Sequence, residues 1–264
     1  MNRTLISLSV AGLLVATAGG AAMGQHPPAA PKGYLGEAAP DTYKILPPAP
    51  TPGTIRYQAD RATFLATRSL KDSPRWSLAT ADADQNAIVK DMSCAIGAEL
   101  TPQNAPTLNK LLLTMRHDVR RATNHPKDIY KRQRPYLIDE GDICVAKTPD
   151  LAASPDYPSG HTTWGWSVGL VLAELAPDRA TEILSRARSY GESRLVCGVH
   201  NMSAVESGRT NGSIIVAGLH GSAEFRADME KARKEIAAAR KSAKAPDGAS
   251  CAAEAELIAK SPYN

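Results

Sequence analysis

Two cations stand at a spacing that suits phosphate binding in KDIYKRQRP, residues 127–135. Lys127 and Arg134 are seven positions apart, about two helical turns, so both side chains are expected on one face of a helix. A guanidinium offers a planar fork and an ammonium a point charge, and together they suit a phosphate-like dianion. Taken alone, the same pattern also fits a solvent-exposed basic helix face.

A second stretch, DYPSGHTTWGWSVGLVLAEL from Asp156, begins like a capped apolar helix. Ser159 is a natural N-cap, and the backbone N–H groups of Gly160 and His161 would then point outward at the positive end of the helix dipole, where anions bind. Glycine lets the backbone approach such an anion closely. His161 would stand beside the anion, placed to give a proton to a leaving group. An ordinary capped helix with a surface histidine is the alternative.

The third stretch, SRLVCGVHNMSA at residues 193–204, adds another cation and another imidazole. Arg194 could be a third phosphate ligand. His200 falls at the start of a helix predicted over 200–219, and a neutral, correctly oriented imidazole is a competent nucleophile toward phosphorus. Considered by itself, His200 would more simply be a buried histidine with its hydrogen bonds satisfied.

The three stretches occur in the order Lys-x6-Arg-Pro, Pro-Ser-Gly-His and Ser-Arg-x5-His. This order closely resembles the three-part signature of the type-2 phosphatidic acid phosphatase superfamily. The YPSGHT and SRLVCG runs, the N-terminal leader and the Pro-rich segment are similar to those of bacterial class A non-specific acid phosphatases. The resemblance covers about residues 57–240.

The resemblance implies an all-α fold, related to that of the vanadium haloperoxidases, and a metal-independent acid phosphatase that needs no cofactor. Its substrates would be soluble phosphomonoesters, its product would include inorganic phosphate, and transfer to alcohols is left open. His200 would attack phosphorus and form a phosphohistidine, and His161 would protonate the leaving alcohol. The phosphoryl oxygens would be held by Lys127, Arg134, Ser159, Gly160 and Arg194.

One position departs from the family pattern, Ser-Arg-x5-His-x3-Asp, whose aspartate holds the histidine in the correct tautomer. Here that position is Ala204, one helical turn past His200. Glu206 points to another face, so Ser203 or a backbone carbonyl is the expected substitute. Loss of an orienting carboxylate can lower a rate by up to about 10⁴, as in a serine protease triad. The sequence therefore predicts that Ala204→Asp raises kcat or leaves it unchanged.

Two other functions compete with the phosphatase hypothesis. A vanadium-type haloperoxidase would share the fold and the anion site, and a non-catalytic phosphate-binding protein would explain Ala204. A membrane lipid phosphatase is disfavoured, because the longest apolar runs after the leader, VGLVLAEL and IIVAGL, are too short to cross a bilayer.

The elements that must position these residues are helices. Periodicity predicts one helix from Tyr57, one over 74–98 and one from Pro106 through MRHDVRRAT. Pro126 is expected to open a short helix that ends before Pro135. Further helices are predicted over 161–175, 178–190, 200–219, 222–243 and 250–259. Strand signals are sparse, so the chain is predicted to be all-α with one compact helical domain over 57–264.

The N-terminus and the composition indicate an exported protein. Residues 1–24 read as a signal peptide, and residues 25–56 as a Pro-rich arm that is extended, either disordered or wrapped on the surface. The mature protein is expected in the periplasm or secreted, with no membrane contact after cleavage. A net charge of +4 without basic runs gives no support for nucleic-acid binding. The oligomeric state, including a homo-oligomer, is left open.

Export permits disulfides, and the chain has four cysteines without a CxxC pair. Of the three complete pairings, the favoured guess is Cys94–Cys251 with Cys144–Cys197. Burial of Cys197 as a small apolar residue is the alternative.

Overall fold

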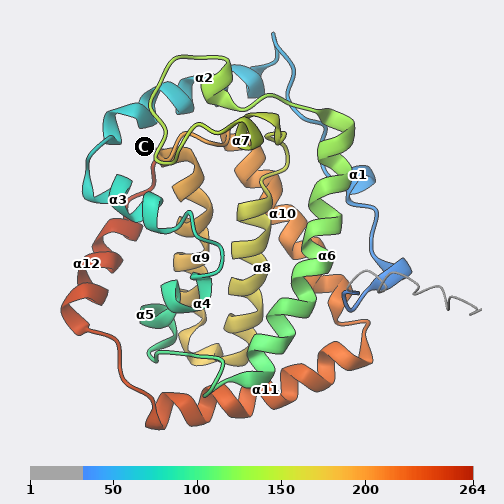
Figure 1. Cartoon of the computed structure of the whole chain (residues 1–264), viewed down its shortest axis with the longest axis vertical. Helices are drawn as coiled ribbons and strands as arrows, with labels where there is room; N and C mark the ends of the chain where they lie inside the picture. Colours follow the sequence, from blue (N-terminus) through green and yellow to red (C-terminus); the bar gives the residue numbers. More distant parts are fainter. Residues whose placement is uncertain (1–31, 264) are drawn as a thin grey trace, which may run out of the picture. The chain divides into compact units, whose positions relative to one another are not determined.

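The computed structural model describes residues 32–263, and within this range every regular element is helical (Figure 1). The predicted all-α fold is thereby confirmed. The predicted signal peptide, residues 1–24, lies outside the described residues. No helix in the described range is both long enough and apolar enough to span a membrane.

Helix α8 (Gly160–Leu175) is the centre of the fold, with α6 (Pro106–Tyr130), α9 (Ala180–Val196) and α10 (Met202–Leu219) around it (Figure 1). It is apolar on nearly all sides, as a helix must be when neighbours cover every face. Close packing needs small residues. A Cβ added at Gly169 would lie 2.3 Å from the Ala187 Cβ, so α8 and α9 meet almost backbone to backbone.

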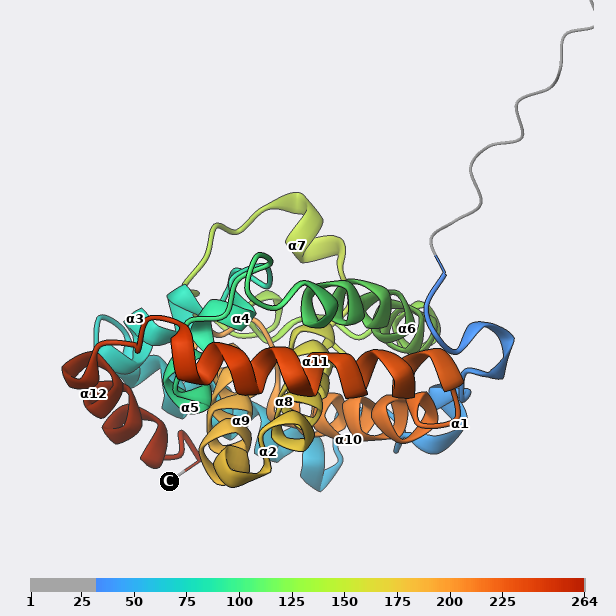
Figure 2. The ribbon, with the colours of Figure 1, turned by 90° about the horizontal axis from the view of Figure 1, so that it is seen from below.

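Two C-terminal helices close the bundle. Helix α11 (Ala223–Ser242) crosses below α6 and α8, as both views show (Figures 1 and 2), and adds Phe225 and Ile236 to the main core. Helix α12 (Gly248–Ala259) packs on α9, where Glu254 Oε2 accepts a hydrogen bond from Arg186 Nε at 3.1 Å. The helices predicted over 178–190, 200–219, 222–243 and 250–259 are confirmed as α9 to α12, although α9 extends six residues further, to Val196.

The helix predicted over 74–98 is wrong, because the chain forms three short helices there: α3 (Pro74–Ala81), α4 (Ile88–Asp91) and α5 (Ser93–Ile96). The break follows Asp82, whose fully buried carboxylate accepts hydrogen bonds from Arg186 Nη2 and Ser193 Oγ, both at 2.5 Å. Just beyond it, Asp84 Oδ1 accepts a hydrogen bond from the Asn86 N–H at 2.9 Å, a local turn contact that competes with the helix. The resulting turn carries residues 82–87 toward the N-terminus of α8.

The short helix predicted to open at Pro126 is also wrong, because α6 runs through this proline to Tyr130. Proline removes an N–H that would have bonded to the carbonyl of Ala122, one turn earlier. That carbonyl instead accepts hydrogen bonds from Thr42 Oγ1 at 2.7 Å and Asn211 Nδ2 at 3.2 Å. Tertiary contacts therefore satisfy the group that the proline leaves open.

The described part of the Pro-rich segment lies against α6. The Asp118 carboxylate accepts hydrogen bonds from the backbone N–H groups of Tyr34 at 2.8 Å and Leu35 at 3.2 Å. The segment includes two short helices, η1 (Gly36–Ala38) and α1 (Thr42–Ile45), which a fully extended arm would lack.

The remaining elements are α2 (Ile55–Thr67) and four short pieces. These pieces are η2 (Arg68–Leu70), η3 (Pro135–Leu137), α7 (Pro149–Ala153) and η4 (Pro177–Arg179). Helix α7 sits on a loop that arches above the other helices in Figure 2. This loop, residues 131–159, joins α6 to α8 and contributes to the site below.

Two disulfides join distant parts of the chain, and both guessed pairs are confirmed. Cys94–Cys251 links α5 to α12 across 157 residues, and Cys144–Cys197 links the 131–159 loop to the end of α9 across 53 residues. The pairs indicate a protein that matures in an oxidising compartment, as expected outside the cytoplasm.

Candidate active site

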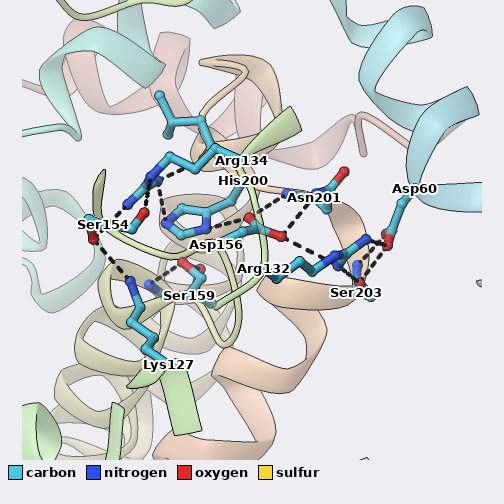
Figure 3. A network of polar contacts seen from close by, with 12 residues as sticks. Asp60, Lys127, Arg132, Arg134, Ser154, Asp156, Ser159, His200, Asn201 and Ser203 are labelled. Atoms are coloured by element: carbon cyan, nitrogen blue, oxygen red, sulfur yellow. Dashed lines mark hydrogen bonds and ion pairs between the residues drawn. The ribbon is translucent and has the colours of Figure 1, made fainter. Parts of the chain in front are cut away.

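A cavity of about 400 Å³ opens at the N-terminus of α8. Its wall is built from five segments: one face of α6, the 82–87 turn, the 131–159 loop, the first residues of α8 and the end of α9 with the turn after it. Six of the seven predicted site residues line it: Lys127, Arg134, Gly160, His161, Arg194 and His200. Figure 3 shows Lys127, Arg134 and His200 pointing toward one another from different segments.

Lys127 and Arg134 converge, but they do not share a helix face as predicted. Helix α6 ends at Tyr130, and Lys131 takes a left-handed conformation with φ of 46°. Arg134 then reaches back from the loop, and both cations meet at Ser154: Lys127 Nζ lies 3.4 Å and Arg134 Nη2 3.2 Å from its Oγ. Burial and the neighbouring Arg134 lower the pKa of Lys127 to about 8.

The start of α8 follows the predicted cap. Ser159 Oγ accepts hydrogen bonds from the Thr162 N–H at 3.2 Å and the Thr162 hydroxyl at 2.9 Å. The Ser159 side chain is therefore engaged in the cap, and the cavity wall at this point is formed by Gly160 and His161. Gly160 also lets α8 approach α6, because a Cβ there would lie 2.9 Å from Thr123 Cγ2.

His161 is fixed on three sides. Its Nδ1 lies 3.2 Å from the Gln85 amide nitrogen, its Nε2 lies 3.5 Å from Arg194 Nη1, and its ring stacks on Tyr190 with 4.5 Å between centroids. Burial, and then the positive charge of Arg194, hold the pKa of His161 well below its usual range. The imidazole is therefore neutral before an anion enters.

Arg194 and His200 are brought together by the turn that ends α9. Gly198 takes a φ of 78°, and the N–H groups of Val199 and His200 both bond back to the Arg194 carbonyl, at 3.1 and 3.3 Å. The last carbonyls of α9 are capped by Arg68, whose Nη2 lies 2.8 Å from the Leu195 oxygen. His200 thus precedes α10, which starts at Met202 rather than at residue 200.

The two ring nitrogens of His200 face opposite charges. Nε2 lies 3.2 Å from Arg134 Nη1, and Nδ1 lies 2.9 Å from Asp156 Oδ1. Burial, followed by the Arg134 charge, lowers the pKa of His200 to about 3, against the opposing effect of Asp156. The ring is consequently neutral through the mildly acidic range.

Asp156 is the site residue that the sequence interpretation missed. It is fully buried, and besides His200 it accepts hydrogen bonds from the Asn201 backbone at 3.1 Å and the Asn201 side chain at 2.9 Å. Ser203, the substitute expected from the sequence, instead donates to Asp60 Oδ2 at 2.6 Å (Figure 3). The available signal was an acidic residue directly before YPSGH.

Within residues 32–263, no group of three or more His, Cys, Asp or Glu side chains is arranged to hold a metal ion. The site's electrostatics come from buried cations and the N-terminus of α8. This helix end adds a partial positive charge to that of the side chains. The arrangement can bind a compact dianion between two neutral imidazoles.

A helical bundle with an anion site at the N-terminus of its central helix is the arrangement of one class of protein, and the chain belongs to that class, the PAP2 superfamily. The model of this family matches residues 110–226. Within that class it is homologous to bacterial acid phosphatases. It is 44% identical to the acid phosphatase of Zymomonas mobilis over 81% of this chain and 82% of the relative. It is 37% identical to the non-specific acid phosphatase of Providencia stuartii, over 76% and 83%, and 36% identical to that of Salmonella typhimurium, over 72% and 78%.

Proposed function

We propose that the protein is an acid phosphatase that hydrolyses soluble phosphomonoesters through a phosphohistidine intermediate, with no metal in the scheme. The observation that carries the proposal is the convergence of Lys127, Arg134 and Arg194 on a cavity that holds His161 and His200. Charge neutralisation and positioning are what phosphoryl transfer requires.

In the proposed first step, the lone pair on His200 Nε2 forms a bond to phosphorus while the bond to the ester oxygen breaks. His161 gives its proton to the departing alkoxide. The bound dianion raises the pKa of His161, so the neutral imidazole first takes up a proton from solvent and then donates it to the alkoxide. In the second step, His161 takes a proton from water, the water oxygen bonds to phosphorus, and the bond to His200 breaks. An alcohol in place of water would give phosphotransfer.

Two observations bear on the competing functions. The non-catalytic hypothesis was motivated by the lack of a carboxylate at position 204. Because the Asp156 carboxylate contacts His200 Nδ1, this reason for doubting catalysis is weakened. The relatives named above are phosphatases, which favours phosphoryl transfer over a haloperoxidase reaction.

The test is hydrolysis of p-nitrophenyl phosphate combined with trapping of the phosphoenzyme in an alkaline denaturing quench. His200→Ala is expected to lower kcat by at least about 10³ and to abolish the trapped phosphate. His161→Ala should slow glycerol 3-phosphate more than p-nitrophenyl phosphate, because the poorer leaving group depends more on the acid. His220→Ala, at a partly exposed histidine beside Glu174, is the matched control. Phosphate trapped on His200→Ala would refute the nucleophile assignment.

A further inference from the structure

We propose that Asp156 is the positioning residue that sets the tautomer of His200, a role the family pattern places at position 204. This inference rests on the proposed function. The Asp156 carboxylate comes from the loop before α8, whereas the pattern expects it from α10, one turn after the histidine. In this chain the carboxylate that contacts the ring therefore comes from another segment than the pattern expects.

The hydrogen bonds around Asp156 leave one arrangement of protons. Oδ1 receives the Asn201 backbone N–H at 3.1 Å and faces His200 Nδ1 at 2.9 Å, and a carboxylate can only accept. Nδ1 of His200 must then carry the proton. Nε2 keeps its lone pair, which faces the Arg134 Nη1 donor at 3.2 Å on the cavity wall, and this is the tautomer that attack on phosphorus needs.

The rest of the network fixes the carboxylate itself. Oδ2 accepts from Asn201 Nδ2 at 2.9 Å and lies 3.3 Å from Arg132 Nη1. Arg132 in turn bonds to Asp60 Oδ2 at 2.6 Å, so one guanidinium lies between two fully buried aspartates (Figure 3). Because every neighbour of Asp156 is a donor, it cannot rotate to another partner without leaving a buried charge unpaired.

Asp156→Asn tests the assignment, because the amide N–H₂ must replace one of the two carboxylate oxygens. In place of Oδ1 it would face the Asn201 backbone N–H and His200 Nδ1, and it would favour the wrong tautomer of His200. In place of Oδ2 it would face two donors, Asn201 Nδ2 and Arg132 Nη1. We expect kcat to fall by about 10² to 10⁴ while KM changes little, since Asp156 is absent from the cavity wall. Asp118→Asn is the matched control: it removes a buried carboxylate that accepts backbone N–H groups of Tyr34 and Leu35, away from the cavity wall and from His200, so it should lower stability and leave kcat within about threefold.

Two further measurements keep the inference testable if Asp156→Asn does not fold. Nitrogen-15 NMR of wild-type His200 should show the proton on Nδ1. Ala204→Asp should lower kcat, against the sequence-based expectation, because it adds a second carboxylate at a fully buried position. A proton on Nε2, a raised kcat in Ala204→Asp, or unchanged kcat in Asp156→Asn would each overturn the role of Asp156. Absence of turnover in the wild type would instead overturn the proposed function.

A different observation, the charge of the cavity wall, carries a second inference. Five cationic side chains and no carboxylate line the cavity: Arg116, Arg120, Lys127, Arg134 and Arg194. One phosphoryl group occupies the last three under the proposed function. Arg116 and Arg120 lie one turn apart on α6, and burial followed by the nearby Arg120 charge lowers the pKa of Arg116. Within the described residues, Arg116 donates hydrogen bonds to the amide oxygens of Asn86 and Gln85, at 2.9 and 3.2 Å, and the nearby Asp84 favours its charge but forms no ion pair with it.

We infer that Arg116 and Arg120 form a subsite for a second anionic group on the alcohol part of the substrate. Gln85 connects Arg116 to His161, with 3.2 Å on each side. His161 stands where the leaving alcohol is protonated, so the pair of arginines faces the leaving-group end of the cavity. A carboxylate or a second phosphate on that alcohol matches their charge and reach.

Glycerol 3-phosphate and 3-phosphoglycerate test this subsite, because the first carries a neutral hydroxymethyl group where the second carries a carboxylate. The wild type should prefer 3-phosphoglycerate in kcat/KM, and Arg116→Gln/Arg120→Gln should reduce that preference about tenfold. Lys231→Gln/Lys234→Gln removes the same charge from exposed positions on α11 and should leave the preference intact. An unchanged ratio in the arginine variant, or an equal loss in the lysine control, would overturn the subsite. Hydrolysis of neither compound by the wild type would count against the proposed function instead.

Discussion

The two histidines of the cavity are both neutral before substrate binds, but the proposed reaction requires them in opposite protonation states. His200 faces Arg134, Lys127 and Asp156, and its pKa of about 3 keeps it available as a nucleophile in acid. His161 faces Arg194, His200 and Arg116, which, after burial, oppose its protonation. In the proposed reaction, the negative charge of a bound phosphate raises the pKa of His161 and makes it a general acid. Under that proposal, the cationic cavity couples binding to activation.

This coupling predicts how kcat depends on pH. A general acid is lost as pH rises, so kcat for glycerol 3-phosphate should fall about tenfold per pH unit above the pKa of His161 in the complex. A nucleophile is lost as pH falls, but for His200 that loss begins only near pH 3. Lys127 has a pKa of about 8, so in His161→Ala residual hydrolysis of p-nitrophenyl phosphate should decline only above about pH 8, as this ligand loses its charge. The same alkaline decline in wild type and His161→Ala would show that another group supplies the proton.

At the scale of elements, the sequence predicts the helices well and their breaks poorly. The six cavity residues were found because their motifs are local in sequence. Asp156 was missed as a partner of His200 because the two lie on different segments and meet only in the folded chain. Rules for single segments likewise could not foresee that Thr42 and Asn211 would satisfy the carbonyl opened by Pro126.

The segments between helices also decide which residues enter the site. The turn after α3 is held by Asp84, whose side chain accepts the Asn86 N–H, and the same turn delivers Gln85 to His161. Asp82, at the end of α3, anchors this part of the chain to Arg186 and Ser193 on α9. A side-chain contact within the turn thus overrides the helical periodicity at the point where the fold supplies a contact to a proposed catalytic residue.

At the scale of the whole molecule, the two disulfides constrain different things. Cys94–Cys251 ties the C-terminal helix α12 to α5 across 157 residues, and neither cysteine lines the cavity. Cys144–Cys197 holds the loop that carries Asp156 against the end of α9, three residues before His200, and the Cys144 N–H bonds to the Cys197 carbonyl at 3.0 Å. One bridge secures the fold, and the other also secures the site.

Replacing both cysteines of one bridge by serine, one bridge at a time, should separate these roles. Chain entropy predicts that Cys94→Ser/Cys251→Ser loses about 5 kcal/mol of unfolding free energy and Cys144→Ser/Cys197→Ser about 4 kcal/mol, the longer loop losing more. The second variant loses less stability but should show the larger fall in kcat per folded molecule. Without the Cys144–Cys197 bridge, the loop that carries Asp156 is no longer covalently tied to the end of α9 beside His200. Denaturant unfolding and steady-state kinetics on the same samples make the comparison. Equal kcat in the two variants would show that packing alone holds the 131–159 loop in place.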